Sequence, residues 1–167
     1  MGLSGSGKST VGRLLAARLG WELVDTDAWI VAQTGRQVHE IFAQDGEPAF
    51  RAWERQAVAA ACDAPRRVIA LGGGAPLDPQ SFALLRRTSA LVWLRAAPET
   101  LAERLRTAEG EVRPLLAGDA PARLRALLAQ RAPVYVLADL VVDTEAQPPE
   151  DVAAQIAAWL HGTSPAR

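Results

Sequence analysis

The sequence predicts an α/β fold of three layers, in which helices cover both faces of a mostly parallel sheet. Short apolar stretches alternate with helical patterns along most of the chain. A glycine-rich motif near the start leads directly into a helix, and a second glycine run follows an apolar stretch in mid-chain. The 167 residues suffice for one core, and no linker-like stretch divides them. One domain over residues 1–167 is therefore expected.

The first half of the chain is expected to be mainly helical around one strand. Val11, Leu14 and Leu15 recur at helical spacing, and Gly20 follows where a C-terminal cap belongs. Gly35 breaks a later helical stretch. In chain order the expected elements are a helix at 11–19, a short buried strand at 22–24, a helix to about 33, and helices at 38–42 and 48–62.

The second half alternates more regularly. An apolar strand stops at a run of three glycines, and Pro98 opens a helix. Glycines, Pro114 and mixed charge predict a loop, which we expect to act as a lid, at about 107–118. The expected elements are strands at 68–71, 91–94 and 140–142, and helices at 79–87, 98–106, 121–130 and 149–160.

Composition narrows the class of protein. The net charge of −1 argues against a nucleic-acid or membrane-surface binder, and no apolar run approaches the length of a membrane span. Cys62 is the only cysteine, which excludes an intrachain disulfide and fits a reducing, cytoplasmic location. His39 and His161 are expected to be ordinary surface residues. We expect a monomer that acts on small molecules.

The motif from Gly2 to Ser9 matches the P-loop pattern G-x-x-x-x-G-K-[ST]. Its backbone N–H groups and the following helix N-terminus predict a site for the phosphates of ATP. Lys8, the only lysine beside seventeen arginines, is expected to reach the β and γ phosphates, and the Ser9 hydroxyl to bind Mg²⁺. The predicted ATP-binding residues of the loop are Gly5, Ser6, Gly7, Lys8, Ser9 and Thr10.

Two further motifs follow apolar strands. Asp25 and Asp27 are two residues apart, so on an extended segment both face one side; the alternative is that Asp27 caps a helix. The glycines at 72–74 lie at the ligand edge of a parallel sheet, although a tight turn is the usual explanation of such a run. Arg113, on the glycine-bounded loop, can swing over a nucleotide.

These residues resemble the shikimate kinases, small P-loop kinases similar in fold to nucleoside monophosphate kinases. The P-loop is generic, whereas the other motifs in this order are specific, and together they span nearly the whole chain. The matching motifs are GxxGxGKST at 2–10, DTD at 25–27, the run G…EIF…GE..FR..E between 35 and 54, GGG at 72–74, RPLL at 113–116, and R-x-P-x-Y followed by AD between 131 and 139.

The resemblance implies transfer of the ATP γ-phosphate to the 3-hydroxyl of shikimate, which yields shikimate 3-phosphate and ADP in aromatic amino acid (chorismate) biosynthesis. It implies that Asp27 bonds the reacting hydroxyl and acts as its general base, and that Asp25 holds waters of Mg²⁺. Arg51 and Arg131 would bind the substrate carboxylate. Shikimate would also contact five other residues: Phe42, Phe50, Gly72, Gly73 and Gly74.

The residues around ATP also have counterparts in this family. The resemblance implies that Lys8 and Arg113 stabilise charge on the transferring phosphoryl group. Arg106 would stack on adenine, with Pro148 or Pro149 on the other face, and the lid would close to exclude water.

The start of the chain departs from the family pattern, because only Met1 precedes the loop where a strand is expected. We expect an open slot between the strand at 68–71 and the strand at 91–94 or 140–142, a loop without its anchor, and a start site assigned about seven or more residues too late. Two alternatives stay open: another small-molecule kinase such as a gluconate kinase, which the paired arginines and the glycine run disfavour, and a nucleotide-binding relative without catalysis.

Overall fold

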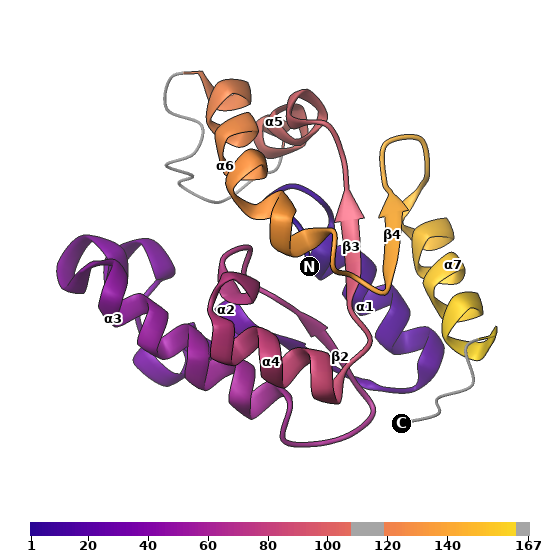
Figure 1. The fold of residues 1–167 in the computed structure, drawn as a ribbon, viewed down its shortest axis with the longest axis horizontal. Coiled ribbons are helices and arrows are strands. Elements are labelled where there is room, and N and C mark those ends of the chain that lie inside the picture. The colour runs from indigo at the N-terminus through magenta and orange to yellow at the C-terminus, as the bar shows by residue number, and fades with distance from the viewer. Residues whose placement is uncertain (108–118, 163–167) are drawn as a thin grey trace.

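The computed structural model describes residues 1–107 and 119–162, in which strands alternate with helices (Figure 1). The strands are β1 (Glu22–Asp25), β2 (Arg67–Ala70), β3 (Val92–Arg95) and β4 (Leu140–Asp143). The helices are α1 (Lys8–Leu19), α2 (Thr26–Thr34), α3 (Val38–Ala61), the 3₁₀ turn η1 (Ala75–Leu77), α4 (Pro79–Thr88), α5 (Pro98–Thr107), α6 (Ala120–Tyr135) and α7 (Pro149–Gly162). The α/β class is confirmed, and the expected lid at 107–118 lies almost wholly outside the described residues.

Among the described residues the strands form two parallel pairs. β1 pairs with β2, and β3 pairs with β4, so that Val24 lies opposite Ile69 and Trp93 opposite Val141. No ladder joins β2 to β3 in this part of the chain, which matches the slot expected between them. The short strands stop one or two residues away from the expected limits.

The expectation that the P-loop lacks an anchor is wrong. The Met1 amino group donates to Val92 O at 2.6 Å, and Leu94 N donates to Met1 O at 2.9 Å. Met1 and Leu3 are both buried, and they belong to the core cluster that contains Trp93. Backbone hydrogen bonds therefore hold Met1, the residue ahead of the loop, against β3, and the apolar packing of Met1 and Leu3 adds to them.

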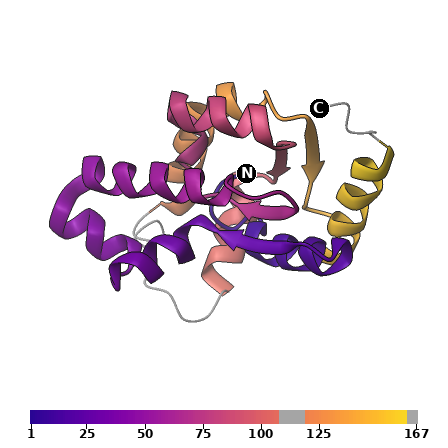
Figure 2. The same cartoon turned by 90° about the horizontal axis from the view of Figure 1, so that it is seen from below.

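Helices cover both faces of the strands because neighbouring strand residues point to opposite sides. Ile69 and Trp93 pack into the cluster formed with α3, α4, α5 and α6. Val68 and Leu94, one residue away on each strand, pack instead with α1 and α7. Figure 2 shows the resulting layers, with α4 above the strands and α1 below them.

The predicted break at residues 45–46 is confirmed inside α3, because Gly46, with φ 81° and ψ 172°, is not helical and separates two helical halves at a kink. Helix α1 begins at Lys8, three residues before its expected start. Helix α6 extends through Pro133 to Tyr135. Pro133 is exposed, so water can bond the carbonyl that this proline leaves without a donor. The longer α6 carries both Arg131 and Tyr135. None of the described helices has the length and apolar character needed to cross a membrane.

Candidate active site

A cleft of about 1730 Å³ opens over the P-loop and the carboxyl end of β1. Helix α1 begins directly after Gly7, whose φ of 89° lies in the left-handed region that favours glycine. No side chain in the described part of the chain caps this helix N-terminus, and its N–H groups can therefore bind an anion. All the residues that were predicted to bind the ATP phosphates line the cleft: Gly5, Ser6, Gly7, Lys8, Ser9 and Thr10.

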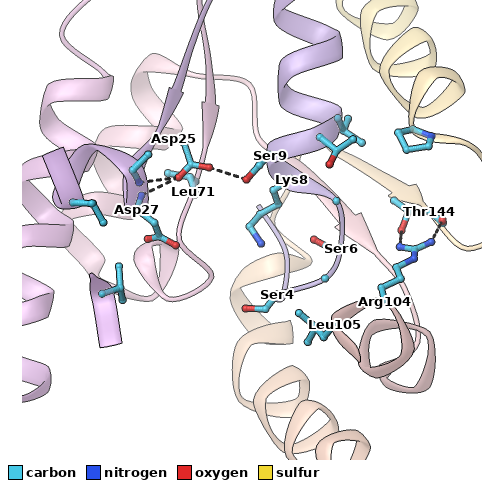
Figure 3. Close-up of a pocket in the computed structure, with 18 of the residues that line it drawn as sticks. Ser4, Ser6, Lys8, Ser9, Asp25, Asp27, Leu71, Arg104, Leu105 and Thr144 are labelled. Atoms are coloured by element: carbon cyan, nitrogen blue, oxygen red, sulfur yellow. Dashed lines mark hydrogen bonds between the residues drawn. The ribbon is translucent and has the colours of Figure 1, made fainter. Parts of the chain in front are cut away.

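Lys8 extends from the loop into the space between the loop and Asp27 (Figure 3). Its ammonium donates to Leu3 O at 2.9 Å. Burial lowers the pKa of Lys8 to about 8, although the nearby Asp27 and Asp25 carboxylates act in the opposite direction. Phosphate oxygens beside this ammonium would favour its charged form, so the group is suited to an anionic ligand.

The Asp25 side chain, at the end of β1, accepts hydrogen bonds both from Ser9 of the P-loop motif and from the start of helix α2. Ser9 Oγ donates to Asp25 Oδ2 at 2.7 Å, and Asp25 Oδ1 accepts from the N–H groups of Asp27 and Ala28 at 3.0 and 3.2 Å. Asp25 therefore caps α2, and the alternative in which Asp27 is the cap does not hold. Asp27 lies in the first turn of the helix, so the extended DTD geometry is also wrong, yet both carboxylates line the cleft.

Mg²⁺ fits the oxygen pair of Ser9 and Asp25. The described residues contain no cluster of three or more His, Cys, Asp or Glu side chains suited to a metal ion. Mg²⁺ bound with nucleotides commonly takes one or two protein oxygens and completes its shell with water and phosphate. A hydroxyl and a carboxylate beside the P-loop match this donor set.

Thr26 connects the start of α2 to the glycine turn, and sequence reasoning assigned it no role. Its side chain is buried; Thr26 Oγ1 accepts from Gly72 N at 2.8 Å and donates to Ala70 O at 3.4 Å. A Cβ built on Gly72 would lie 2.8 Å from Asp27 Oδ1. The turn therefore packs directly against the Asp27 carboxylate.

The two predicted carboxylate-binding arginines meet at this turn although they come from distant parts of the chain. A Cβ on Gly73 would lie 2.5 Å from Arg131 Nη1, and one on Gly74 would overlap the guanidinium of Arg51. Only residues without a side chain let both guanidinium groups approach so closely. The glycine run is therefore a turn that brings the two arginines together. Leu71, just before it, lines the cleft, whereas the three glycines and the two arginines are not among the lining residues, so their contact with a ligand stays a prediction.

Glu54 holds Arg51 in place, and sequence reasoning missed this function. Glu54 is 2% exposed, and Arg51 Nη1 donates to its Oε2 at 2.6 Å. Glu47 binds the same guanidinium through Nη2 at 2.8 Å and Nε at 3.1 Å. Burial raises the pKa of the Glu54 carboxyl, and Arg51 acts in the opposite direction. An acidic residue three positions after Arg51 on a helix was the available signal.

The two phenylalanines form an aromatic pair beside this end of the cleft, with ring centroids 4.4 Å apart. Phe42 is 38% exposed and lines the cleft, whereas Phe50 is 4% exposed and belongs to a core cluster with Ile41. The Arg51 guanidinium lies 5.5 Å from the Phe50 ring centroid. Phe42 is therefore placed to touch a ligand, and Phe50 supports Phe42 and Arg51.

The opposite end of the cleft is lined by Arg104, Thr144 and Pro149. Arg104 donates to Thr144 Oγ1 at 2.9 Å and to Thr144 O (Figure 3). Arg106 is exposed, pairs with Glu103 at 2.7 Å, and is not among the residues that line the cleft. Its stacking on adenine stays a prediction.

The roles predicted for Arg113 cannot be placed, since Arg113 lies outside the described residues.

Comparisons with known proteins agree with this geometry. Residues 4–161 match the family model described as shikimate kinase. The chain is 44% identical over 164 residues to the shikimate kinase of Moorella thermoacetica, covering 96% of this chain and 94% of that protein. It is 49% identical over 158 residues to the shikimate kinase of Symbiobacterium thermophilum, covering 93% of this chain and 91% of that one.

Solved structures show the same likeness. The shikimate kinase of Acinetobacter baumannii in complex with shikimate superposes with a TM-score of 0.89 at 32% identity, covering 98% of this chain and 92% of that one. A gluconokinase from Sinorhizobium meliloti shares the fold alone, with a TM-score of 0.64 at 22% identity. From the family match and these identities over nearly the whole length, we conclude that the chain belongs to the shikimate kinase family.

Proposed function

We propose that the chain transfers the γ-phosphoryl group of ATP to the 3-hydroxyl of shikimate, giving shikimate 3-phosphate and ADP. One observation carries the proposal. A single cleft leads from the P-loop to Asp27, and the glycine turn packed against Asp27 contacts Arg51 of α3 and Arg131 of α6. The site thus offers a phosphate cradle, a base and a carboxylate site in that order. The relative from Acinetobacter baumannii was solved with shikimate bound.

At the nucleotide end, the P-loop N–H groups and Lys8 hold the phosphates of ATP. The lysine charge offsets the negative charge that develops on the transferring group. Mg²⁺, when bound at Ser9 and Asp25, supplies further positive charge to the phosphates. Arg104 and Pro149 border the end of the cleft that is left for the nucleoside.

At the acceptor end, Asp27 accepts the proton of the reacting hydroxyl at one carboxylate oxygen. The hydroxyl oxygen forms a bond to the γ-phosphorus, and the bond from that phosphorus to the β–γ bridging oxygen breaks, so that ADP leaves with the electron pair. Lys8 lies near enough to Asp27 for their charges to interact.

Arg131 and Arg51 both bind the substrate carboxylate, but they differ in the number of carboxylates of the protein that already pair with each guanidinium. Arg51 already pairs with Glu47 and Glu54. No ion pair of Arg131 occurs among the described residues. Its Nε is buried and lacks a hydrogen-bond partner there. Arg131 is thus the guanidinium with the greater need of a ligand carboxylate.

We also propose that the enzyme is a cytoplasmic monomer. ATP is a cytoplasmic co-substrate, and Cys62 is a free thiol. Both substrates contact one chain in the arrangement described above, so no second copy is needed to complete the site.

The test is ADP release measured with shikimate, with gluconate and without an acceptor. We expect turnover with shikimate and little with the other two. Both acids carry a carboxylate, so the paired arginines do not by themselves disfavour gluconate, and the comparison tests recognition of the ring and its hydroxyls. Turnover with gluconate alone would identify the rival kinase, and ATP binding without turnover on either acid would identify a non-catalytic relative.

Arg131→Ala adds a test of the carboxylate site. A charge-assisted hydrogen bond contributes about 1.5–3 kcal/mol, so KM for shikimate should rise about ten- to a hundredfold while KM for ATP stays the same. Arg55→Ala is the matched control, because Arg55 is an exposed arginine of α3 whose nearest acid is Asp78 at 3.6 Å. Equal losses for both substrates in Arg131→Ala would show that Arg131 does not recognise the carboxylate.

A further inference from the structure

Helix α6 presents two side chains, one turn apart, to the middle of the glycine turn. A Cβ on Gly73 would lie 2.5 Å from Arg131 Nη1 and 3.6 Å from Tyr135 OH. Residues four apart lie on the same face of a helix. Arg131 and Tyr135 therefore contact Gly73 together, and the position of one is linked to the position of the other.

The hydroxyl of Tyr135 is committed to this turn. Tyr135 OH donates to Gly73 O at 2.6 Å, and the side chain is 0% exposed. The Tyr135 ring packs against Trp93 of β3 with centroids 5.6 Å apart. The apolar surroundings of the ring could accept phenylalanine, so the packing alone does not require a hydroxyl.

The electrostatics connect Tyr135 to Arg131. Burial raises the pKa of Tyr135, whereas the nearby Arg131 charge and a hydrogen bond from that arginine act in the opposite direction. Arg131 makes no ion pair among the described residues, and its Nε has no hydrogen-bond partner there. The orientation of its guanidinium therefore depends on the other groups next to it. The groups that interact with Arg131 are the Gly73 backbone, the Tyr135 phenol, the Glu54 carboxyl and the Lys8 ammonium. Tyr135 is the one of these that also holds the turn, through its hydrogen bond to Gly73 O.

We propose that Tyr135 is a positioning residue for substrate recognition: its hydroxyl fixes the Gly73 carbonyl and the adjacent Arg131 guanidinium in the orientation that receives the carboxylate of the acceptor. The inference rests on the proposed function, since it assumes that Arg131 binds the carboxylate of shikimate. Loss of the hydroxyl frees the turn and the end of α6 to shift, and the guanidinium leaves its position beside Gly73 while it keeps its charge.

Tyr135→Phe tests the proposal because it removes the hydroxyl and keeps the ring. We expect KM for shikimate to rise about tenfold, since one neutral hydrogen bond usually contributes about a factor of ten, while KM for ATP changes less than twofold. An unchanged KM for shikimate, or equal changes for both substrates, would overturn the proposal.

Trp93→Phe is the matched control, because it changes the packing against the Tyr135 ring and keeps the Tyr135 hydroxyl. This variant should melt earlier and keep KM for shikimate near the wild-type value. If Trp93→Phe reproduces the selective rise in KM, the effect comes from core packing and the hydroxyl has no positioning role.

A spectroscopic measurement reports on the same contact without turnover. Tyr135 is the only tyrosine of the chain, so tyrosine labelled with ¹³C at Cζ gives a single resonance from the protein. Shikimate should shift this resonance, and a non-hydrolysable ATP analogue alone should not. A resonance that does not respond to shikimate would contradict the proposal.

The wild-type assay separates the two levels of inference. Wild-type enzyme that does not phosphorylate shikimate would overturn the proposed function and this inference together. An active wild type with an unaltered Tyr135→Phe variant would overturn this inference alone.

Discussion

Gly72→Ala should slow phosphoryl transfer without unfolding the protein. Gly72 is buried two residues after the end of β2, and its φ is not positive, so alanine introduces no backbone strain. The added methyl group would lie 2.8 Å from Asp27 Oδ1 and 2.9 Å from Glu54 Oε1. Carbon–oxygen contacts settle near about 3.3 Å or more, so both contacts must lengthen.

Asp27 is the carboxylate that moves farther, while a shift of a few tenths of an ångström relieves the contact with Glu54. Glu54 is buried and held by Arg51 at 2.6 Å, whereas the Asp27 side chain is exposed in the cleft. A displacement of about 0.5 Å restores an ordinary contact. Misplacement of a reacting group by about 1 Å can cost about a hundredfold in rate, so half that displacement should lower kcat about tenfold.

The assay measures kcat, both KM values and Tm for Gly72→Ala beside Gly162→Ala. The control adds the same methyl group at the end of α7, where no atom of the described residues lies within 4 Å of it. We expect the tenfold loss in kcat for Gly72→Ala, an unchanged KM for ATP, and Tm values within a few degrees of the wild type. An unchanged kcat would refute the reasoning, as would a loss of activity explained by a large fall in Tm, because Glu54 would then be the group displaced.

Three further outcomes are expected. Asp27→Asn should lower kcat at least about a hundredfold while ATP, titrated calorimetrically, binds as before; full turnover would remove Asp27 from the mechanism. The pKa of Lys8 is lowered from 10.5 to about 8, so below pH 8 the unliganded protein holds a buried positive charge that destabilises the folded state. Its free energy of unfolding should therefore rise between about pH 8 and 10.5. ATP should bind more weakly as pH rises through 8 and should take up a proton there, whereas Lys8→Met should show neither dependence; the ¹³Cε resonance of the single lysine checks the pKa. Arg104→Ala should raise KM for ATP more than Arg106→Ala does, because Arg104 bonds Thr144 and lines the cleft; the reverse order would assign the base contact to Arg106.

Local patterns were sufficient for most of the elements and for the phosphate site. All four strands lie within two residues of the expected limits, because short apolar runs between glycines and prolines have few other ways to bury their side chains. The P-loop motif also predicts its own structure, since Gly7 needs left-handed backbone and the helix begins at the next residue.

The sequence of α5 contained enough information to predict which of its arginines faces the cleft, because helical spacing places each residue relative to the buried leucines. Leu101 and Leu105 form the buried stripe of this helix. Arg104 lies beside the stripe and reaches the cleft, whereas Arg106 lies on the exposed face with Glu103. The two arginines are two positions apart, about 200° around the helix axis, so they cannot face the same ligand in one straight helix.

The sequence by itself determined which residues can hold phosphate and where strands and helices alternate, because these depend on neighbours within a few positions. Only the tertiary structure decided that Arg51 of α3 and Arg131 of α6 meet at the glycine turn, that Glu54 and Tyr135 hold the two sides of that turn, and that Asp25 is the residue that caps α2. These contacts depend on how the helices pack across the strands, and packing is a property of the whole core.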